Sequence, residues 1–341
     1  MEIETSNTPK AQLFALSSSC MDVLSDVITT MRTGLPHSAR IDRSAPFGRR
    51  FPSSDAAGFH VVLQGTAWLI PDDGDPVSLG PGDVVFLPGG VGHGLADSPS
   101  TPLVDAPASL AELRSEELLS EELRSASQET QVPGAAPVTV MLCGAYLLDR
   151  SRTHPLLQEL PDVVHLPTQV GRRLQLRAAL DLLGGELESV RPGSDAMVPA
   201  LLDVLLLHIL RAWFDEHRDT PTGWTAALND PPVAAALRAM HGEPQRQWSV
   251  QELAGHAGLS RAAFARRFTT LVGQPPLAYL TWWRMTIAAR LLRASDMPAN
   301  AVAGKVGYTS EYAFAHAFKR AYGRPPGAYR RQGRHHHAAT S

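Results

Sequence analysis

The side chains best suited to chemistry are histidines, cysteines and arginines, and they fall in separate stretches of the chain. His60 and His93 lie in segments rich in valine and glycine, and Cys20 and Cys143 are the two cysteines. Lysines and arginines gather toward the C-terminus. Imidazoles and thiolates bind metals, whereas clustered cationic groups neutralise phosphate. The sequence therefore raises three kinds of chemistry: a metal or ligand site, a redox pair, and nucleic-acid binding.

Charge is divided unevenly along the 341 residues. From Asp230 onward, 15 Lys and Arg face 5 Asp and Glu, a formal charge of +10. The preceding residues carry 16 basic against 29 acidic side chains, a formal charge of -13. A basic region of this kind binds phosphate with an affinity that falls steeply with salt. The acidic region should repel DNA and thereby keep the molecule oriented on it.

The basic part contains the same pattern twice. The first copy, LAGHAGLSRAAFARRFTTLVGQPP, covers 253–276, and the second, VAGKVGYTSEYAFAHAFKRAYGRPP, covers 302–326. In each copy a glycine turn is followed by a serine, Ser260 or Ser310, that can cap a helix with two phenylalanines on one face. The pattern predicts two helix-turn-helix units, and the apolar spacing between them predicts a long connecting helix.

These motifs resemble the DNA-binding domain of the AraC/XylS transcription regulators over roughly 230–331. The resemblance implies two units that enter successive major-groove segments about one DNA turn, roughly 34 Å, apart. It also implies double-stranded promoter DNA and RNA polymerase as partners. Members of the family activate transcription more often than they repress it.

Helical geometry places one face of each second helix opposite its phenylalanines, and these positions match the base-reading positions of the family. Arg266 is the candidate for a bidentate contact to guanine, and Arg261 and Arg267 are candidates for phosphate contacts. Glu311 could accept from cytosine; for every such residue the alternative is a solvated helix face. The expected DNA-binding residues are Ser260, Arg261, Ala262, Ala265, Arg266 and Arg267 in the first unit, and Ser310, Glu311, Tyr312, Ala315, His316, Lys319, Arg320 and Arg324 in the second.

Before this region, the hydrophobic period changes to that of short strands. HVVLQGTAWLI follows Phe59, an Asp-Gly pair predicts a hairpin at 72–75, and a second pair of strands is expected around the turn at 81–82. The run GDVVFLPGGVGH, which ends at His93, resembles the second signature motif of the cupin barrels. A cupin-like domain in front of an AraC-type region implies a sensor of a small molecule or a stress signal.

The first cupin motif lacks its metal ligands. Its ligand positions fall on Pro52, Ser54 and Gly58, none of which binds a metal through its side chain. His60 and His93 remain, fewer than the three or four protein ligands usual for zinc. We therefore expect no metal and no cofactor. The two histidines either line a small-molecule site or are barrel residues with backbone hydrogen bonds.

The remaining segments complete an α+β multidomain fold. Helices are expected from residue 21 to 31, from 172 to 188 and from 196 to 214, and the last is apolar on nearly all sides, which predicts a homodimer contact. The expected organisation is a flexible tail (1–18), a cupin-like barrel (19–150) with a variable insert (96–137), a helical packing or dimerisation segment (151–216), a linker (217–230), the double helix-turn-helix domain (231–331) and a tail (332–341).

Three alternatives stay open at this point. Cys20 and Cys143 could form a thiol-redox sensor in a regulator of the same family. A metal-dependent cupin enzyme fused to a DNA-binding domain is disfavoured by the missing ligands, so we expect no enzyme. We identify no apolar run of the roughly 20 residues that span a bilayer and no signal peptide, which predicts a cytoplasmic protein without a membrane contact.

Overall fold

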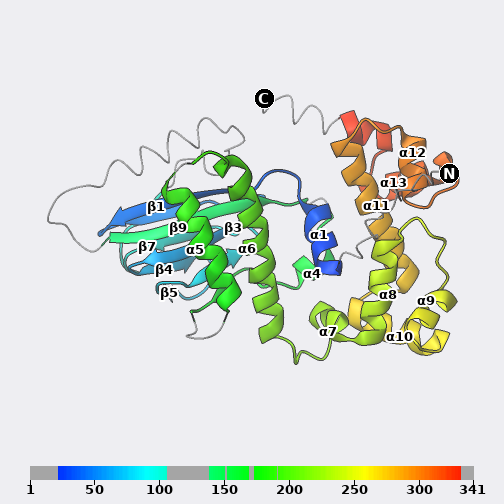
Figure 1. Cartoon of the computed structure of the whole chain (residues 1–341), viewed down its shortest axis with the longest axis horizontal. Coiled ribbons are helices and arrows are strands. Elements are labelled where there is room, and N and C mark those ends of the chain that lie inside the picture. The colour runs from blue at the N-terminus through cyan, green and yellow to red at the C-terminus, as the bar shows by residue number, and fades with distance from the viewer. Residues whose placement is uncertain (1–21, 106–137, 150–151, 169–172, 190, 332–341) are drawn as a thin grey trace, which may run out of the picture.

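The computed structural model describes residues 22–105, 138–149, 152–168, 173–189 and 191–331. Figure 1 shows two sheets with helices along one side, joined to an all-helical C-terminal part. The α+β fold class is confirmed. The tails at 1–18 and 332–341, Cys20 and most of the expected insert, 106–137, lie outside the described residues.

Within the described residues, ten strands form two five-stranded sheets. The first sheet has the order β1-β9-β3-β6-β10, with bounds His37–Ser44, Val138–Leu147, Ala56–Gln64, Val84–Leu87 and Val164–Leu166. The second has the order β5-β4-β7-β2-β8, with bounds Val77–Leu79, Ala67–Pro71, His93–Ala96, Gly48–Phe51 and Val104–Asp105. The strand pairs are antiparallel except β2 with β8.

Alternation along the first sheet separates two cores. In β3, Phe59 and Val61 point to the helices outside the sheet, whereas Val62 points into the space between the sheets. In β9, Leu142 belongs to the outer cluster and Cys143 to the inner one. Successive side chains of a strand face opposite sides, so this sheet is buried on both faces. That double burial explains why β3, β6 and β9 are rich in valine and leucine.

The strand expectations hold in part. The hairpin at 72–75 is confirmed, because β4 and β5 pair across it. The expected pair around 81–82 is wrong: β5 pairs in the second sheet and β6 in the first, so the turn crosses between sheets. β10 pairs with β6 although it lies beyond the predicted barrel boundary at residue 150. The barrel therefore needs a strand that sequence analysis assigned to the helical segment.

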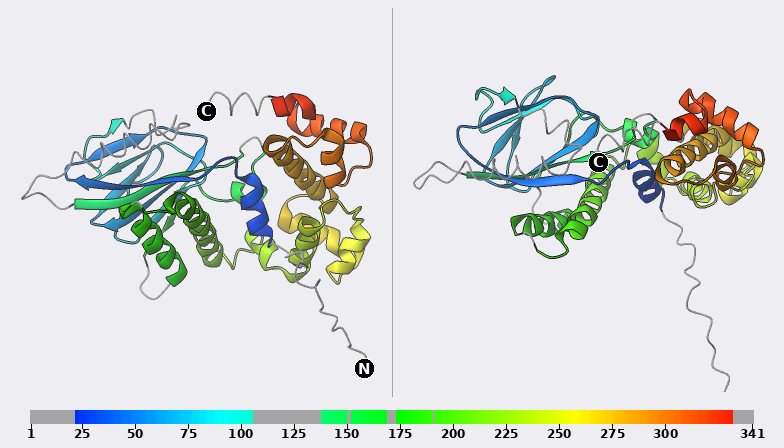
Figure 2. Two further views of the ribbon diagram at one scale, coloured as in Figure 1. Left: turned by 45° about the horizontal axis from the view of Figure 1, so that its top comes forward. Right: turned by 90° about the horizontal axis from the view of Figure 1, so that it is seen from above.

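Helices α5 (Leu174–Glu188) and α6 (Ser194–Glu216) cover the outer face of the first sheet, as the two views of Figure 2 show. α6 is 23 residues long and, contrary to our expectation, apolar enough to cross a membrane by length and composition. Here Leu202, Leu205 and Leu206 are buried in the outer core, and Asp203 pairs with Arg32. α6 therefore serves as a core helix.

The C-terminal part is all-helical in the described residues. Its helices are α7 (Gly223–Asn229), α8 (Pro231–Gly242), α9 (Val250–His256), α10 (Arg261–Val272), α11 (Pro276–Ala294), α12 (Ala299–Lys305) and α13 (Glu311–Tyr322). The range 217–230, expected to be a linker, contains α7. Trp224 of α7 is fully buried, and its backbone N–H donates to Glu159 at 2.6 Å. The expected linker is therefore a packed bridge.

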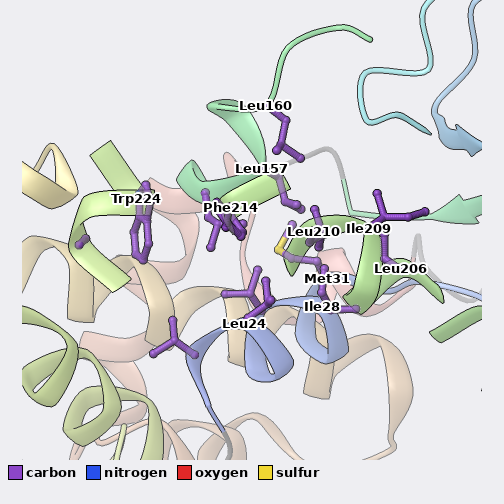
Figure 3. Close-up of a cluster of buried hydrophobic side chains, with 14 of the residues drawn as sticks. Leu24, Ile28, Met31, Leu157, Leu160, Leu206, Ile209, Leu210, Phe214 and Trp224 are labelled. Carbon is purple, nitrogen blue, oxygen red and sulfur yellow. The ribbon is translucent and has the colours of Figure 1, made fainter. Parts of the chain in front are cut away.

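The barrel and the helical part share one apolar core. Helix α1 (Val23–Met31) and the short α4 (Pro155–Gln158) lie between them (Figure 1). Figure 3 shows Leu24 and Ile28 of α1, Leu157 of α4, Phe214 of α6 and Trp224 of α7 in one cluster. The same cluster continues into α8, α9 and α10. The two parts of the chain thus pack against each other over a continuous hydrophobic surface.

Candidate DNA-binding interface

The first helix-turn-helix unit consists of α9 and α10. Ser249 and Glu252 form the expected capping box: the Ser249 N–H donates to the Glu252 carboxylate at 2.8 Å, and the Glu252 N–H donates to the Ser249 hydroxyl at 3.1 Å. Gly258 makes the turn with a φ of +66°, a conformation that favours glycine. Ser260 caps α10 through the N–H of Ala263. Local chemistry therefore sets both the start of each helix and the angle between them.

The side chains of α10 divide into a buried and an exposed face. Phe264 and Phe268 are fully buried, as their spacing predicted. Arg261, Ala262 and Arg266 are exposed, and Ala265 is half-buried. The exposed face thus carries two guanidinium groups among small residues, which lets a helix approach the edges of bases closely.

Arg267 has another partner. Its guanidinium binds the Asp230 carboxylate, with 2.8 Å from Nε to the nearer oxygen. Asp230 is buried, caps α8 through the N–H of Val233 at 3.0 Å, and has a pKa lowered by these hydrogen bonds against the effect of its burial. The ion pair gives Arg267 a structural role that ties α10 to α8, and the phosphate contact that the sequence predicts for it stays a prediction.

The second unit repeats the geometry with a different surface. Ser310 caps α13 through the N–H of Ala313 at 3.3 Å, and Phe314 is buried like its counterpart. The side chain of Tyr312 is 75% exposed, and its ring lies 4.5 Å from that of His316. Ala315 is half-buried. Four further expected DNA contacts of this unit are exposed: Glu311, Lys319, Arg320 and Arg324.

The barrel histidines meet between the sheets. His60 of β3 and His93 of β7 are both buried, and their Nε2 atoms lie 2.7 Å apart. Nδ1 of His93 lies 2.9 Å from the carbonyl of Val91, which can only accept, so His93 carries its proton on Nδ1. His60 must then donate from Nε2. Phe51 stacks on His93 with ring centroids 5.1 Å apart.

Burial decides the charge of this pair. It lowers the pKa of His93, and it lowers the pKa of His60 further with the help of the neighbouring His93. Both imidazoles are therefore neutral at pH 7. The assigned tautomers leave Nδ1 of His60 as a buried acceptor, and the described residues supply no hydrogen-bond partner for it. Within the same described ranges, no three His, Cys, Asp or Glu side chains lie close enough to hold a metal ion.

Comparison with known proteins decides the family. A cupin family model matches residues 22–215, and a helix-turn-helix domain model matches 253–332. An AraC-like transcription regulator from Streptomyces lividans is 34% identical over 91% of this chain and 98% of its own length. The chain belongs to the AraC-like transcription regulators. It is a DNA-binding regulator rather than an enzyme, with a cupin-like domain in front of its helix-turn-helix domain.

Two further matches of this AraC-like regulator are informative. The RCS-specific HTH-type transcriptional activator RclR from Escherichia coli K12 is 29% identical over 85% of this chain and 92% of its own length. The DNA-binding domain of AdpA, solved in complex with a target DNA, is 37% identical, with 31% of this chain and 96% of that domain covered and a TM-score of 0.30. The cupin model also spans α5 and α6, which we had assigned to a separate segment.

The regulator also contains a buried polar chain that sequence analysis missed. The hydroxyl of Tyr279 in α11 lies 3.1 Å from Nε2 of His154 and 2.6 Å from Nε2 of His241. Nδ1 of His154 accepts from the N–H of Leu156 at 3.1 Å, so His154 donates from Nε2. The Tyr279 hydroxyl then donates to His241, whose Nδ1 lies 3.3 Å from Asp26 of α1.

This chain joins the two domains, and its two imidazoles are neutral at pH 7. Burial lowers the pKa of His154 well below its usual value, with a smaller effect of His241, and burial also lowers the pKa of His241 against the opposing effect of Asp26. His154 and Tyr279 are separated by 125 residues, and His154 lies outside any motif. Its only signal in the sequence was a histidine before a proline, which does not indicate an interdomain contact.

Proposed function

We propose that this regulator binds promoter DNA with both helix-turn-helix units at once and activates transcription in the cytoplasm together with RNA polymerase. The observation that carries the proposal is the pair of capped units mounted on one helix, α11, which is 19 residues long. A helix of that length spans about 28 Å, close to the rise of one DNA turn. The name of RclR as an activator supports the direction of regulation.

The assignment of base reading centres on Arg266. It is exposed on α10 beside small residues, whereas Arg267 is held by Asp230. A bidentate contact from arginine to guanine contributes about 1 to 3 kcal/mol of discrimination. In the second unit Glu311, Tyr312 and His316 offer fewer cations, so we assign the positioning of the DNA backbone there to Lys319, Arg320 and Arg324.

Selection of bound genomic fragments with the full-length protein tests this function. We expect a shared motif with two blocks about ten base pairs apart. Arg266→Ala should relax the preference at one position of one block. Arg238→Ala, which removes the same charge from an exposed site on α8, serves as the control and should leave the motif unchanged. Salt-sensitive binding without any motif would contradict sequence-specific reading by the full-length protein alone.

We assign effector binding to the surroundings of His60 and His93. The inner core between the sheets contains Val62, Leu69 and Val85, and Nδ1 of His60 is a buried polar atom that a hydrogen-bond donor would satisfy. Native mass spectrometry of protein purified from cells should show a bound small molecule that His60→Leu loses. Retention of the molecule by His60→Leu would place its binding site elsewhere.

A homodimer is supported by the outer face of the α5 and α6 pair. Leu174 and Leu182 of α5 are 67% and 59% exposed, and Met197 and Val204 of α6 are also exposed. Large exposed apolar side chains gathered on one part of a surface are typical of association surfaces. Sedimentation velocity at micromolar concentration should give the dimer mass, and Leu182→Glu should give the monomer mass. A monomeric wild-type protein would rule the dimer out at that concentration.

The thiol-redox alternative finds little support in the described residues. Cys143 is buried in the inner core, and burial raises the pKa of its thiol to about 12. A thiol of that kind is inert, because the thiolate is the reactive form. A Cys143→Ser variant is therefore expected to keep the response of the regulator.

A further inference from the structure

Helix α11 belongs to two hydrophobic cores in turn. Its first half contributes Leu280 and Trp283 to the core of the first unit, and its second half contributes Met285 and Ala288 to the separate core of the second. The change from one core to the other falls at Arg284. The half-buried Ile287 packs against both cores, while the fully buried side chains of α11 divide between them, so polar contacts near Arg284 also contribute to the angle between the units.

Arg284 turns toward the loop between α8 and α9, residues 243–249. Its Nε donates to the carbonyl of Pro244 at 2.6 Å, and a terminal nitrogen donates to the carbonyl of Arg246 at 2.6 Å. The rigid fork of a guanidinium fixes both partners at once. The loop is itself held in shape, since the Arg246 guanidinium stacks 4.0 Å from the ring centre of Trp248.

The same loop contacts the turn of the second unit. The side-chain amide of Gln247 donates to the carbonyl of Gly307. A Cβ atom at Gly307 would lie 2.6 Å from the carbonyl oxygen of Gln245 and 2.9 Å from the Arg284 guanidinium. Gly258, the equivalent glycine of the first unit, has a similar positive φ, but a Cβ there would meet no described atom within 4 Å. The second turn is therefore docked against the first unit.

We propose that Arg284, Gln247 and Gly307 form a clamp that fixes the separation and angle of α10 and α13. The clamp thereby determines how many base pairs may lie between the two blocks of the operator. One inserted base pair displaces a block by about 3.4 Å and rotates it by roughly 35°. A clamped pair of helices cannot follow that change, whereas a pair joined only by α11 can adapt by bending. The proposal rests on both units engaging DNA, as proposed above.

The test uses full-length protein and duplexes selected from a random-sequence library. The selected site is then compared with derivatives that carry one base pair more or fewer between the blocks. We expect wild-type protein to bind the altered spacings about tenfold more weakly, which is the usual effect of one wrong position. Arg284→Gln should reduce this difference to less than about threefold, mainly by weaker binding at the original spacing.

Matched variants separate the clamp from other effects. Arg290→Gln removes the same charge from an exposed position of α11 and should keep the spacing preference. Gly307→Ala should lose the preference, whereas Gly258→Ala, with similar backbone strain, should keep it. Gln247→Ala removes an exposed side chain and is therefore expected to fold. It should lose the spacing preference, and it tests the clamp even if the Arg284 and Gly307 variants do not fold.

The outcomes distinguish the two proposals. Wild-type protein that binds every spacing equally would contradict simultaneous reading by two units. Wild-type protein that prefers one spacing, together with folded clamp variants that retain the tenfold difference, would overturn the clamp and leave the double reading intact.

Discussion

The two helix-turn-helix units share their local architecture and differ in their surroundings. Each has a serine cap, a glycine turn and a buried pair of phenylalanines. Phe264 of the first unit belongs to a cluster that also contains Val27 of α1 and Trp224 of α7. Phe314 of the second unit belongs to a cluster formed by α11, α12 and α13. The two similar motifs therefore pack into different hydrophobic cores.

The polar contacts with the cupin-like domain also differ between the two units. The first unit is joined through the buried polar chain of His154, Tyr279 and His241, and Nδ1 of His241 lies 3.3 Å from Asp26 of α1. Near the second unit, Arg293 binds Asp149 at 2.6 Å and contacts Tyr329. The cupin-like domain therefore contacts the first unit through the shared core and the end of α11 through an ion pair. The two units are therefore similar in sequence but differ in their contacts with the cupin-like domain.

The largest expected effect comes from removing one phenylalanine from each core. Phe264→Ala and Phe314→Ala should each cost about 3 to 5 kcal/mol of local stability. All six tryptophans lie outside the second unit, so their fluorescence reports the cupin-like domain, α7 and the first unit. Phe264→Ala should lower the urea midpoint seen by fluorescence, whereas Phe314→Ala should change circular dichroism first. Equal fluorescence shifts for both variants would contradict the division of the two units between separate cores.

Acid should loosen the first unit before the second. The folded pKa values of His154 and His241 lie below the ordinary value of 6.5, so the unfolded chain binds more protons as the pH falls. Their contribution to the free energy of unfolding is complete above pH 6.5. Below that pH it is lost by about 1.4 kcal/mol per pH unit for each proton that the unfolded chain takes up.

The groups facing this pair are the Tyr279 hydroxyl, the Asp26 carboxylate and tryptophan rings including Trp224 and Trp283. Below pH 6.5, the urea midpoint of His154→Gln should depend less on pH than that of the wild-type protein. An unchanged slope in that variant would show that His154 does not take up the proton.

The smallest effect concerns two arginines of the same helix. Arg261→Ala should reduce the slope of log affinity against log salt by about 1, because it removes one phosphate contact. Arg267→Ala should leave that slope unchanged, since Asp230 already holds the guanidinium, and should lower the stability of the first unit instead. Fluorescence anisotropy over a salt series measures both slopes. A reduced slope for Arg267→Ala would confirm the phosphate contact that the sequence predicts.

Local features of this fold follow from the sequence, and its long-range contacts do not. The capping box of Ser249 and Glu252 and the buried faces of α10 and α13 depend on residues three or four apart, so spacing predicts them. The pair of Arg267 with Asp230 spans 37 residues, and no spacing rule relates the two positions. The packed helix α7 was predicted to be a linker because proline and glycine flank it, and its burial depends on the tertiary contacts of Trp224.

The shared core of the cupin-like domain and the first unit is tested most directly by native-state hydrogen exchange of the full-length protein in increasing urea. The opening free energy of amides in α10 should match that of α1, because their side chains belong to one cluster. Amides of α13 should open independently and at lower free energy. If the α10 amides instead exchanged together with those of α13 and apart from α1, the two units would form one cooperative body and the account would be contradicted.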